Sequence, residues 1–187
     1  MIHRWQTIVR YSAPLLTVCV LVELFAGQLL QGNQEMLILF PIFLITIPVI
    51  NSVGGNIGSV LGARLASGLH VGYITPAVND KEMRSNVLVT MLLGVVTYTV
   101  LAILIYGIAV FGGLHTGIGL ITFVTVIVGA GFFLICVIVM ISVLTAFLSF
   151  KKGLDPDDMV APVVTTIGDV MGIVLLFLIL GIFGVGL

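Results

Sequence analysis

The stretch DPDDMVAPVVTTIGDVMGIVLLFLI, residues 155–179, joins three acidic residues to an apolar run long enough to cross a bilayer. A transmembrane helix needs about 20 mostly apolar residues, and one further acid, Asp169, lies inside this run. A carboxylate at the bilayer centre costs about 2.5–3.5 kcal/mol on insertion scales, and such residues typically mark ion or proton pathways. This one helix therefore predicts a membrane protein and suggests ion transport.

The composition extends the membrane prediction to the whole chain. Of its 187 residues, 60% are hydrophobic and 8% are charged, and the mean hydropathy is +1.33. Soluble domains carry about 25% charged residues. The net charge of −1 argues against nucleic acid as a partner. We predict an all-α, polytopic protein of the lipid bilayer, with a single transmembrane domain over residues 1–187 and no cytosolic regulatory domain.

Five segments of the chain are apolar and long enough to span a membrane. The predicted helices cover residues 12–31, 36–69, 86–111, 118–149 and 159–186. The second and fourth helices are longer than one crossing of the bilayer requires, so they should tilt, kink or project beyond it. An odd number of helices cannot form two equal inverted repeats, so the simplest completion is a two-fold homodimer.

The basic residues predict the orientation of these helices. They precede the first helix or lie around the connections between the second and third and between the fourth and fifth: Arg4, Arg10, Arg64, Lys81, Arg84, Lys151 and Lys152. Basic residues concentrate on the cytoplasmic side of membrane proteins. We therefore expect a cytoplasmic N-terminus, an external C-terminus and a location in the plasma membrane.

Small residues recur every four positions in PVINSVGGNIGSVLGARLASG, residues 48–68. Gly54, Gly58 and Gly62 form one row, and a second row begins at Gly55. Rows of this kind let helices approach closely in lipid, so close packing is one explanation for them.

Oxygen-bearing groups in the same segment favour a second explanation, that the segment lines a pore. Pro48 leaves a backbone carbonyl near Leu44 without its usual partner, and the amides of Asn51 and Asn56 flank the pair Gly54–Gly55. Free carbonyls and amides at membrane depth must be buried in protein or line a wet cavity. Hard oxygen ligands suit Mg²⁺, which keeps several of its waters, so the segment is a candidate pore wall.

Several polar residues surround Asp169 on the last predicted helix. At 3.6 residues per turn, Thr165, Thr166 and Gly172 share its face, and Asp158 lies on the same stripe about 16 Å toward the cytoplasmic end. No Lys or Arg lies within the apolar depth of any predicted helix, except for Arg64 near the inner end of the second. We therefore expect Asp169 to be neutral, hydrated or bound to a cation.

Glu23 is the other acid at membrane depth, in the first predicted helix. A role in the pore and a structural hydrogen bond to a neighbouring helix both remain open for it. The acids Asp155, Asp157 and Asp158 could attract cations or cap the last helix. The zinc-protease motif HExxH is absent from the sequence, and we predict neither an enzyme nor a bound cofactor.

Two motifs together resemble a known family. PVINSVGGNIGSVLGARLASGLHVG, residues 48–72, and GLDPDDMVAPVVTTIGDVMGIVLL, residues 153–176, resemble the membrane domain of the MgtE magnesium channels. They are closer still to one half of the related eukaryotic solute-carrier magnesium transporters. The resemblance implies a dimer of five-helix units in which the second and fifth helices line a central Mg²⁺ pathway. It places a pore carboxylate at Asp169 and oxygen ligands around Gly54, Gly55 and Asn56.

The predicted function is therefore transport of a divalent cation, most simply Mg²⁺, by a homodimer. Other transported cations, such as Mn²⁺, Co²⁺ or Na⁺ in a coupled exchange, stay open. A non-transporting helical subunit of a larger membrane complex is the alternative from another class. That alternative predicts a basic residue of a partner beside Asp169.

Overall fold

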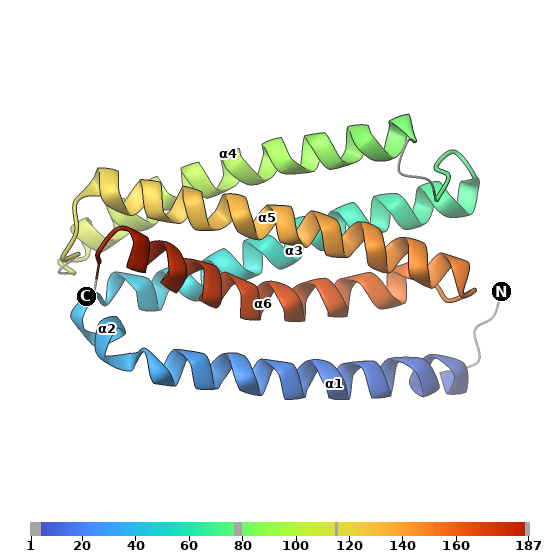
Figure 1. Ribbon diagram of the computed structural model, residues 1–187, viewed down its shortest axis with the longest axis horizontal. Coiled ribbons are helices and arrows are strands. Elements are labelled where there is room, and N and C mark those ends of the chain that lie inside the picture. The colour runs from blue at the N-terminus through green and yellow to red at the C-terminus, as the bar shows by residue number, and fades with distance from the viewer. Residues whose placement is uncertain (1–4, 77–79, 115, 186–187) are drawn as a thin grey trace.

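The computed structural model describes residues 5–76, 80–114 and 116–185, which form helices and connecting loops without any strand (Figure 1). The helices are α1 (Trp5–Gly32), α2 (Gln34–Leu39), α3 (Ile42–Val71), α4 (Lys81–Phe111), α5 (Leu120–Lys151) and α6 (Pro156–Ile182). Five of them, all except the short α2, are long and apolar enough to cross a membrane. The predicted all-α fold with five spans is confirmed.

The long helices run side by side along one axis (Figure 1). The most extensive contact joins α3 to α6, and α5 packs against both of them. At one edge of the bundle α4 packs on α5 and α3, and at the opposite edge α1 packs on α6. Because α1 has so little of its surface covered, much of it is open to lipid or to another chain.

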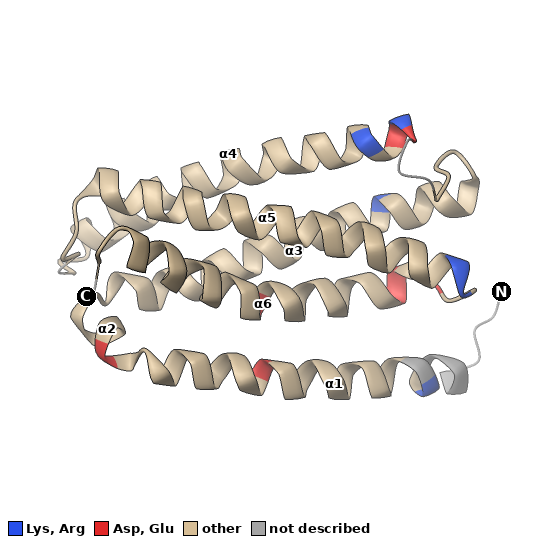
Figure 2. Cartoon of the chain, in the orientation of Figure 1, with Lys and Arg blue, Asp and Glu red and all other residues tan. Residues whose placement is uncertain are grey.

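The basic residues lie at one end of the bundle. Figure 2 shows Lys and Arg gathered at the end where α1 begins and where the α3–α4 and α5–α6 connections lie. Arg4 is outside the described residues. This clustering at one end is the one that the sequence led us to expect for a cytoplasmic end, and α6 ends on the opposite side (Figure 1).

The second predicted helix, residues 36–69, is in fact two helices. α2 ends at Leu39 and α3 begins at Ile42. Phe40 between them has φ −126° and ψ 75°, outside the helical region, because a residue that precedes a proline is driven out of that region. Pro41 also lacks an N–H for the helical ladder, so the prediction of one continuous helix from Met36 was wrong. For the last helix, predicted to reach residue 186, the end at Ile182 is observed and residue 186 is outside the described residues.

Asp80 begins α4 as its N-cap. Its carboxylate accepts a hydrogen bond from the N–H of Met83 at 3.0 Å, and from the N–H and hydroxyl of Thr75 at 3.1 and 2.9 Å. The bond from Met83, followed by that from the Thr75 backbone, lowers the pKa of Asp80 below its usual 3.8. Charged caps of this kind also interact favourably with the positive end of the helix dipole.

A pH dependence of stability follows from this cap. A carboxyl group whose pKa is lower in the folded state stabilises the protein above its unfolded pKa, and loses that effect as pH falls through the folded pKa. We expect the unfolding temperature of the wild type to fall faster than that of Asp80→Asn below about pH 4. Above about pH 5 the unfolding temperatures of the two proteins should change in parallel with pH. Equal slopes over the whole range, measured by circular dichroism in micelles, would exclude this role.

Candidate cation site

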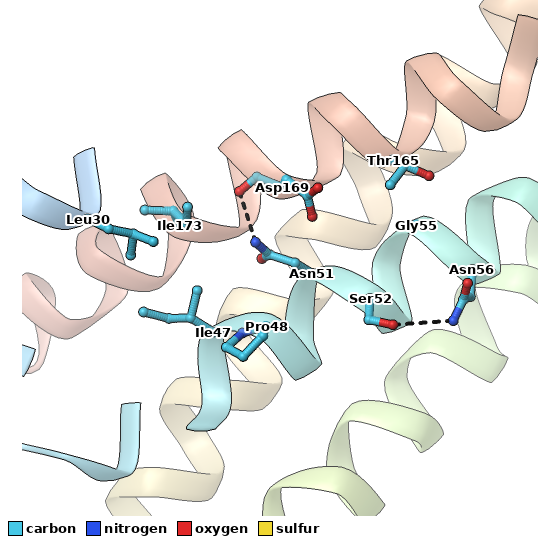
Figure 3. Close-up of a pocket in the computed structure, with 10 residues that line it drawn as sticks. All are labelled: Leu30, Ile47, Pro48, Asn51, Ser52, Gly55, Asn56, Thr165, Asp169 and Ile173. Carbon is cyan, nitrogen blue, oxygen red and sulfur yellow. Dashed lines mark hydrogen bonds between the residues drawn. The ribbon is translucent and has the colours of Figure 1, made fainter. Parts of the chain in front are cut away.

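A cavity of about 570 Å³ opens among α1, α3 and α6 (Figure 3). Its lining comes mainly from α3 and α6, with one residue of α1: Leu30, Ile47, Pro48, Asn51, Ser52, Gly55, Asn56, Thr165, Asp169 and Ile173. Six of the ten residues singled out from the sequence therefore lie together in this cavity: Pro48, Asn51, Gly55, Asn56, Thr165 and Asp169. Asp169 lies at the middle of α6, Pro156–Ile182.

A hydrogen bond joins α3 to α6 at the level of Asp169. Asn51 donates from Nδ2 to the backbone carbonyl of Asp169 at 3.1 Å (Figure 3). Its own Oδ1 is buried and has no hydrogen-bond partner among the described residues. A Cβ at position 172 would overlap this oxygen, so Gly172 makes the room in which the amide lies.

The glycines of α3 let α6 pack closely against α3 beside the cavity. A Cβ at Gly55 would lie 3.2 Å from Oγ1 of Thr165, and one at Gly62 would overlap the side chain of Val160. The row therefore serves close packing, as small residues do between membrane helices. Gly54 is turned the other way, toward Leu134 of α5, and does not line the cavity.

Tyr98 of α4 supports α3 from behind the cavity, and the sequence analysis did not identify it. Its side chain is fully buried, and its hydroxyl donates to the carbonyl of Ile50 at 2.9 Å. The ring lies against Gly131 of α5, where a Cβ would overlap it. A buried tyrosine hydroxyl needs a hydrogen-bond partner. A tyrosine within an apolar span could therefore have been predicted to bind a neighbouring helix.

Besides Gly54, three predicted residues lie outside the cavity: Thr166, Glu23 and Asp158. Thr166 is buried and donates from Oγ1 to Oε1 of Glu23 on α1 at 3.3 Å. Asp158 is exposed in the first turn of α6. Its neighbour Asp155 is the N-cap of that helix and accepts a hydrogen bond from the N–H of Asp157 at 3.1 Å. The acidic stretch therefore provides a helix cap.

The polar groups of the cavity are oxygen donors and amides. Asp169 contributes a half-buried carboxylate, Thr165 and Ser52 contribute hydroxyls, and Asn56 contributes an amide that donates to Ser52 at 3.5 Å. No group of three or more His, Cys, Asp or Glu residues that could hold a metal ion occurs in the described parts of the chain. One carboxylate among hydroxyls and amides suits a divalent cation that keeps its water shell.

Replacement of Asn51 tests whether its amide is there for stability. For Asn51→Leu we expect the free energy of unfolding to change by less than about 1 kcal/mol, because losing one hydrogen bond is offset by removing a buried acceptor that has no partner. Asn51→Ala should destabilise more, since it also leaves a cavity. Unfolding by denaturing detergent would measure both. If both variants lose the same free energy of unfolding, the hydrogen bond to Asp169 is the main stabilising contribution of Asn51.

A comparison with protein families shows which family the chain belongs to. The family model for MgtE, described as a divalent cation transporter, matches residues 47–179. The match runs from the first turns of α3 to the last turn of α6, so it includes every residue that lines the cavity except Leu30. It covers most of the chain and both helices that carry the polar lining. The chain therefore belongs to the MgtE family of divalent cation transporters, which are membrane transport proteins and not enzymes.

Proposed function

We propose that this chain carries a hydrated divalent cation, Mg²⁺ before others, across the plasma membrane along the α3–α6 cavity. The observation that supports the proposal most strongly is the position of Asp169. Its half-buried carboxylate lies at the middle of α6 in a cavity with hydroxyl and amide neighbours. An ionisable group at that depth typically marks an ion path.

The path requires a second copy of the chain. The cavity is open, and one copy contributes only one carboxylate to it. In a two-fold dimer with α3 and α6 facing their equivalents, two Asp169 side chains would lie on either side of the axis. Their combined charge attracts a divalent ion about twice as strongly as a monovalent one at equal distance. Selectivity for divalent ions then follows from charge.

The choice of Mg²⁺ follows from the kind of ligand. The cavity lining presents oxygen and amide groups, and neither sulfur nor imidazole is among its residues. Oxygen ligands suit Mg²⁺, Ca²⁺ and Mn²⁺, whereas softer ions prefer nitrogen and sulfur. Because Mg²⁺ gives up its waters reluctantly, the hydroxyls and the carboxylate would bind the water shell and not the bare ion.

Flux into liposomes that contain only the purified chain tests the proposal. A Mg²⁺ indicator inside the vesicles should report uptake down a concentration gradient, and Mn²⁺ and Co²⁺ should be tested beside it. Repeating the assay with a Na⁺ gradient separates a channel from an exchanger. If no cation moves under any gradient, the chain does not transport by itself and is a subunit of a larger complex.

A further inference from the structure

One face of α1 is directed at α6, although most of the helix is open. Cys19, Glu23, Ala26 and Leu30 follow each other at spacings of four, three and four residues, which places them on one side of a helix. Cys19 and Ala26 are buried, and the thiol of Cys19 lies 3.8 Å from the carbonyl oxygen of Pro162. Leu30 lines the cation cavity. Glu23 therefore belongs to the face that packs on α6 and leads into the cavity.

The carboxylate of Glu23 keeps most of its binding capacity free. It accepts one hydrogen bond, from the hydroxyl of Thr166 at 3.3 Å, and no Lys or Arg forms an ion pair with it among the described residues. The residue is exposed even though it lies on the α6-facing side. A structural hydrogen bond needs only a neutral acceptor, so it does not account for an acid at this depth.

Glu23 and Asp169 lie at the same level of the bundle. Thr166, the partner of Glu23, precedes Asp169 by three residues on α6, or about 4.5 Å along the helix axis. Glu23 lies near the middle of the first span, Ser12–Gly32, and Asp169 near the middle of α6, Pro156–Ile182. Two carboxylates at one level of the bundle repel each other, and a cation between or beside them relieves that repulsion.

A third group points to the same kind of ligand. Asn51 lines the cavity beside Asp169, is 7% exposed, and has a buried Oδ1 without a partner in the described residues. A buried acceptor without a partner is rare and calls for an explanation. The water shell of a divalent cation supplies hydrogen-bond donors for the two carboxylates, and for this oxygen once the amide rotates away from Gly172.

We propose that Glu23 is a second carboxylate site for the hydrated divalent cation, so that α1 forms part of the transport path beside α3 and α6. This inference rests on the proposed function. Glu23 lies outside the segment that matches the MgtE family, residues 47–179. Each copy of the chain then offers the ion two negative charges at mid-membrane, and the ion passes from one carboxylate to the other without losing its waters.

Two variants separate the charge of Glu23 from its hydrogen bond. Glu23→Gln keeps the volume and an oxygen that accepts from Thr166, but removes the charge. Thr166→Val removes the hydrogen bond and keeps the charge. Glu35→Gln, the same chemical change at an exposed position of α2, is the matched control. Each protein would be assayed for the Mg²⁺ concentration that gives half-maximal flux and for the rise in unfolding temperature that Mg²⁺ causes.

We expect Glu23→Gln to raise the half-saturating Mg²⁺ concentration about tenfold, the effect of losing one charge-assisted hydrogen bond, and to reduce the thermal shift caused by Mg²⁺. Thr166→Val and Glu35→Gln should stay within about twofold of the wild type. If Glu23→Gln behaves as the wild type, or if Thr166→Val reproduces its effect, Glu23 is a structural residue and the inference fails.

The failure of this inference differs from that of the proposed function. If Asp169→Asn stops flux while Glu23→Gln leaves both readouts unchanged, transport stands and only the role of Glu23 is lost. If the wild type carries no cation, the proposed function fails. The thermal shift still decides whether Glu23 binds Mg²⁺, because it requires no flux.

Discussion

Asp169→Asn is expected to lower Mg²⁺ flux at least about 100-fold without changing the fold or the proposed dimer. The substitution keeps the volume of a side chain that is only half-buried, and the bond from Asn51 goes to the backbone carbonyl, which the variant retains. Hydrogen bonds to a charged group are worth about 1.5–3 kcal/mol each. Two copies lose one carboxylate each, and every 1.4 kcal/mol is about tenfold in affinity.

Asp158→Asn is the matched control for this prediction. It makes the same chemical change on the same helix, at an exposed residue of the first turn. Surface charges act through water and are screened by salt, so flux should fall less than about threefold at physiological salt. Equal losses in the two variants would mean that overall negative charge, and not the site in the cavity, controls the flux.

The largest effect on folding is expected from Gly58→Val. A Cβ at this position would overlap the side chains of Val164 on α6 and Ile138 on α5. Both neighbours are β-branched and stiff at χ1, so the helices themselves would have to move apart. The hydroxyl of Ser142, which donates to the carbonyl of Ile138 at 2.8 Å, also lies 3.2 Å from the carbonyl oxygen of Gly58, and it would lose this second contact. We expect a loss of at least about 3 kcal/mol in the free energy of unfolding.

Gly107→Ala is the control for that result. Gly107 lies within α4, and a Cβ there would meet no atom within 4 Å. Because alanine is favoured over glycine in helices by about 1 kcal/mol, this variant should be as stable as the wild type or more stable. Detergent unfolding measures both variants. Similar stability for Gly58→Val and Gly107→Ala would contradict the close α3–α5–α6 contact.

The number of spans and the position of Asp169 could be predicted because both depend on local composition. The break at Pro41 could not, because Pro48 carries the same local signal and yet lies within the continuous helix α3. A proline leaves the helix intact where the surrounding helices hold it, and that depends on packing. At Phe40 the chain leaves the helical region, with φ −126° and ψ 75°.

The details of the cavity depend on which helices become neighbours. Thr165 and Thr166 are adjacent in sequence and looked equivalent, yet the first lines the cavity and the second is covered by α1. Helical periodicity places residues on faces, but it does not say which face meets α1. The bond from Tyr98 to Ile50 needs the relative register of α3, α4 and α5. No pattern within one helix contains that information.

Accessibility of the cavity to ions would test the central claim most directly. Thr165→Cys, made with Cys19 and Cys136 replaced by alanine, places a thiol one turn from Asp169 and leaves the carboxylate intact. If the cavity is the ion path, a small cationic thiol reagent should modify this position, modification should stop Mg²⁺ flux, and Mg²⁺ should slow the modification. A variant that is fully modified and still carries Mg²⁺ at the original rate would show that the ion passes elsewhere.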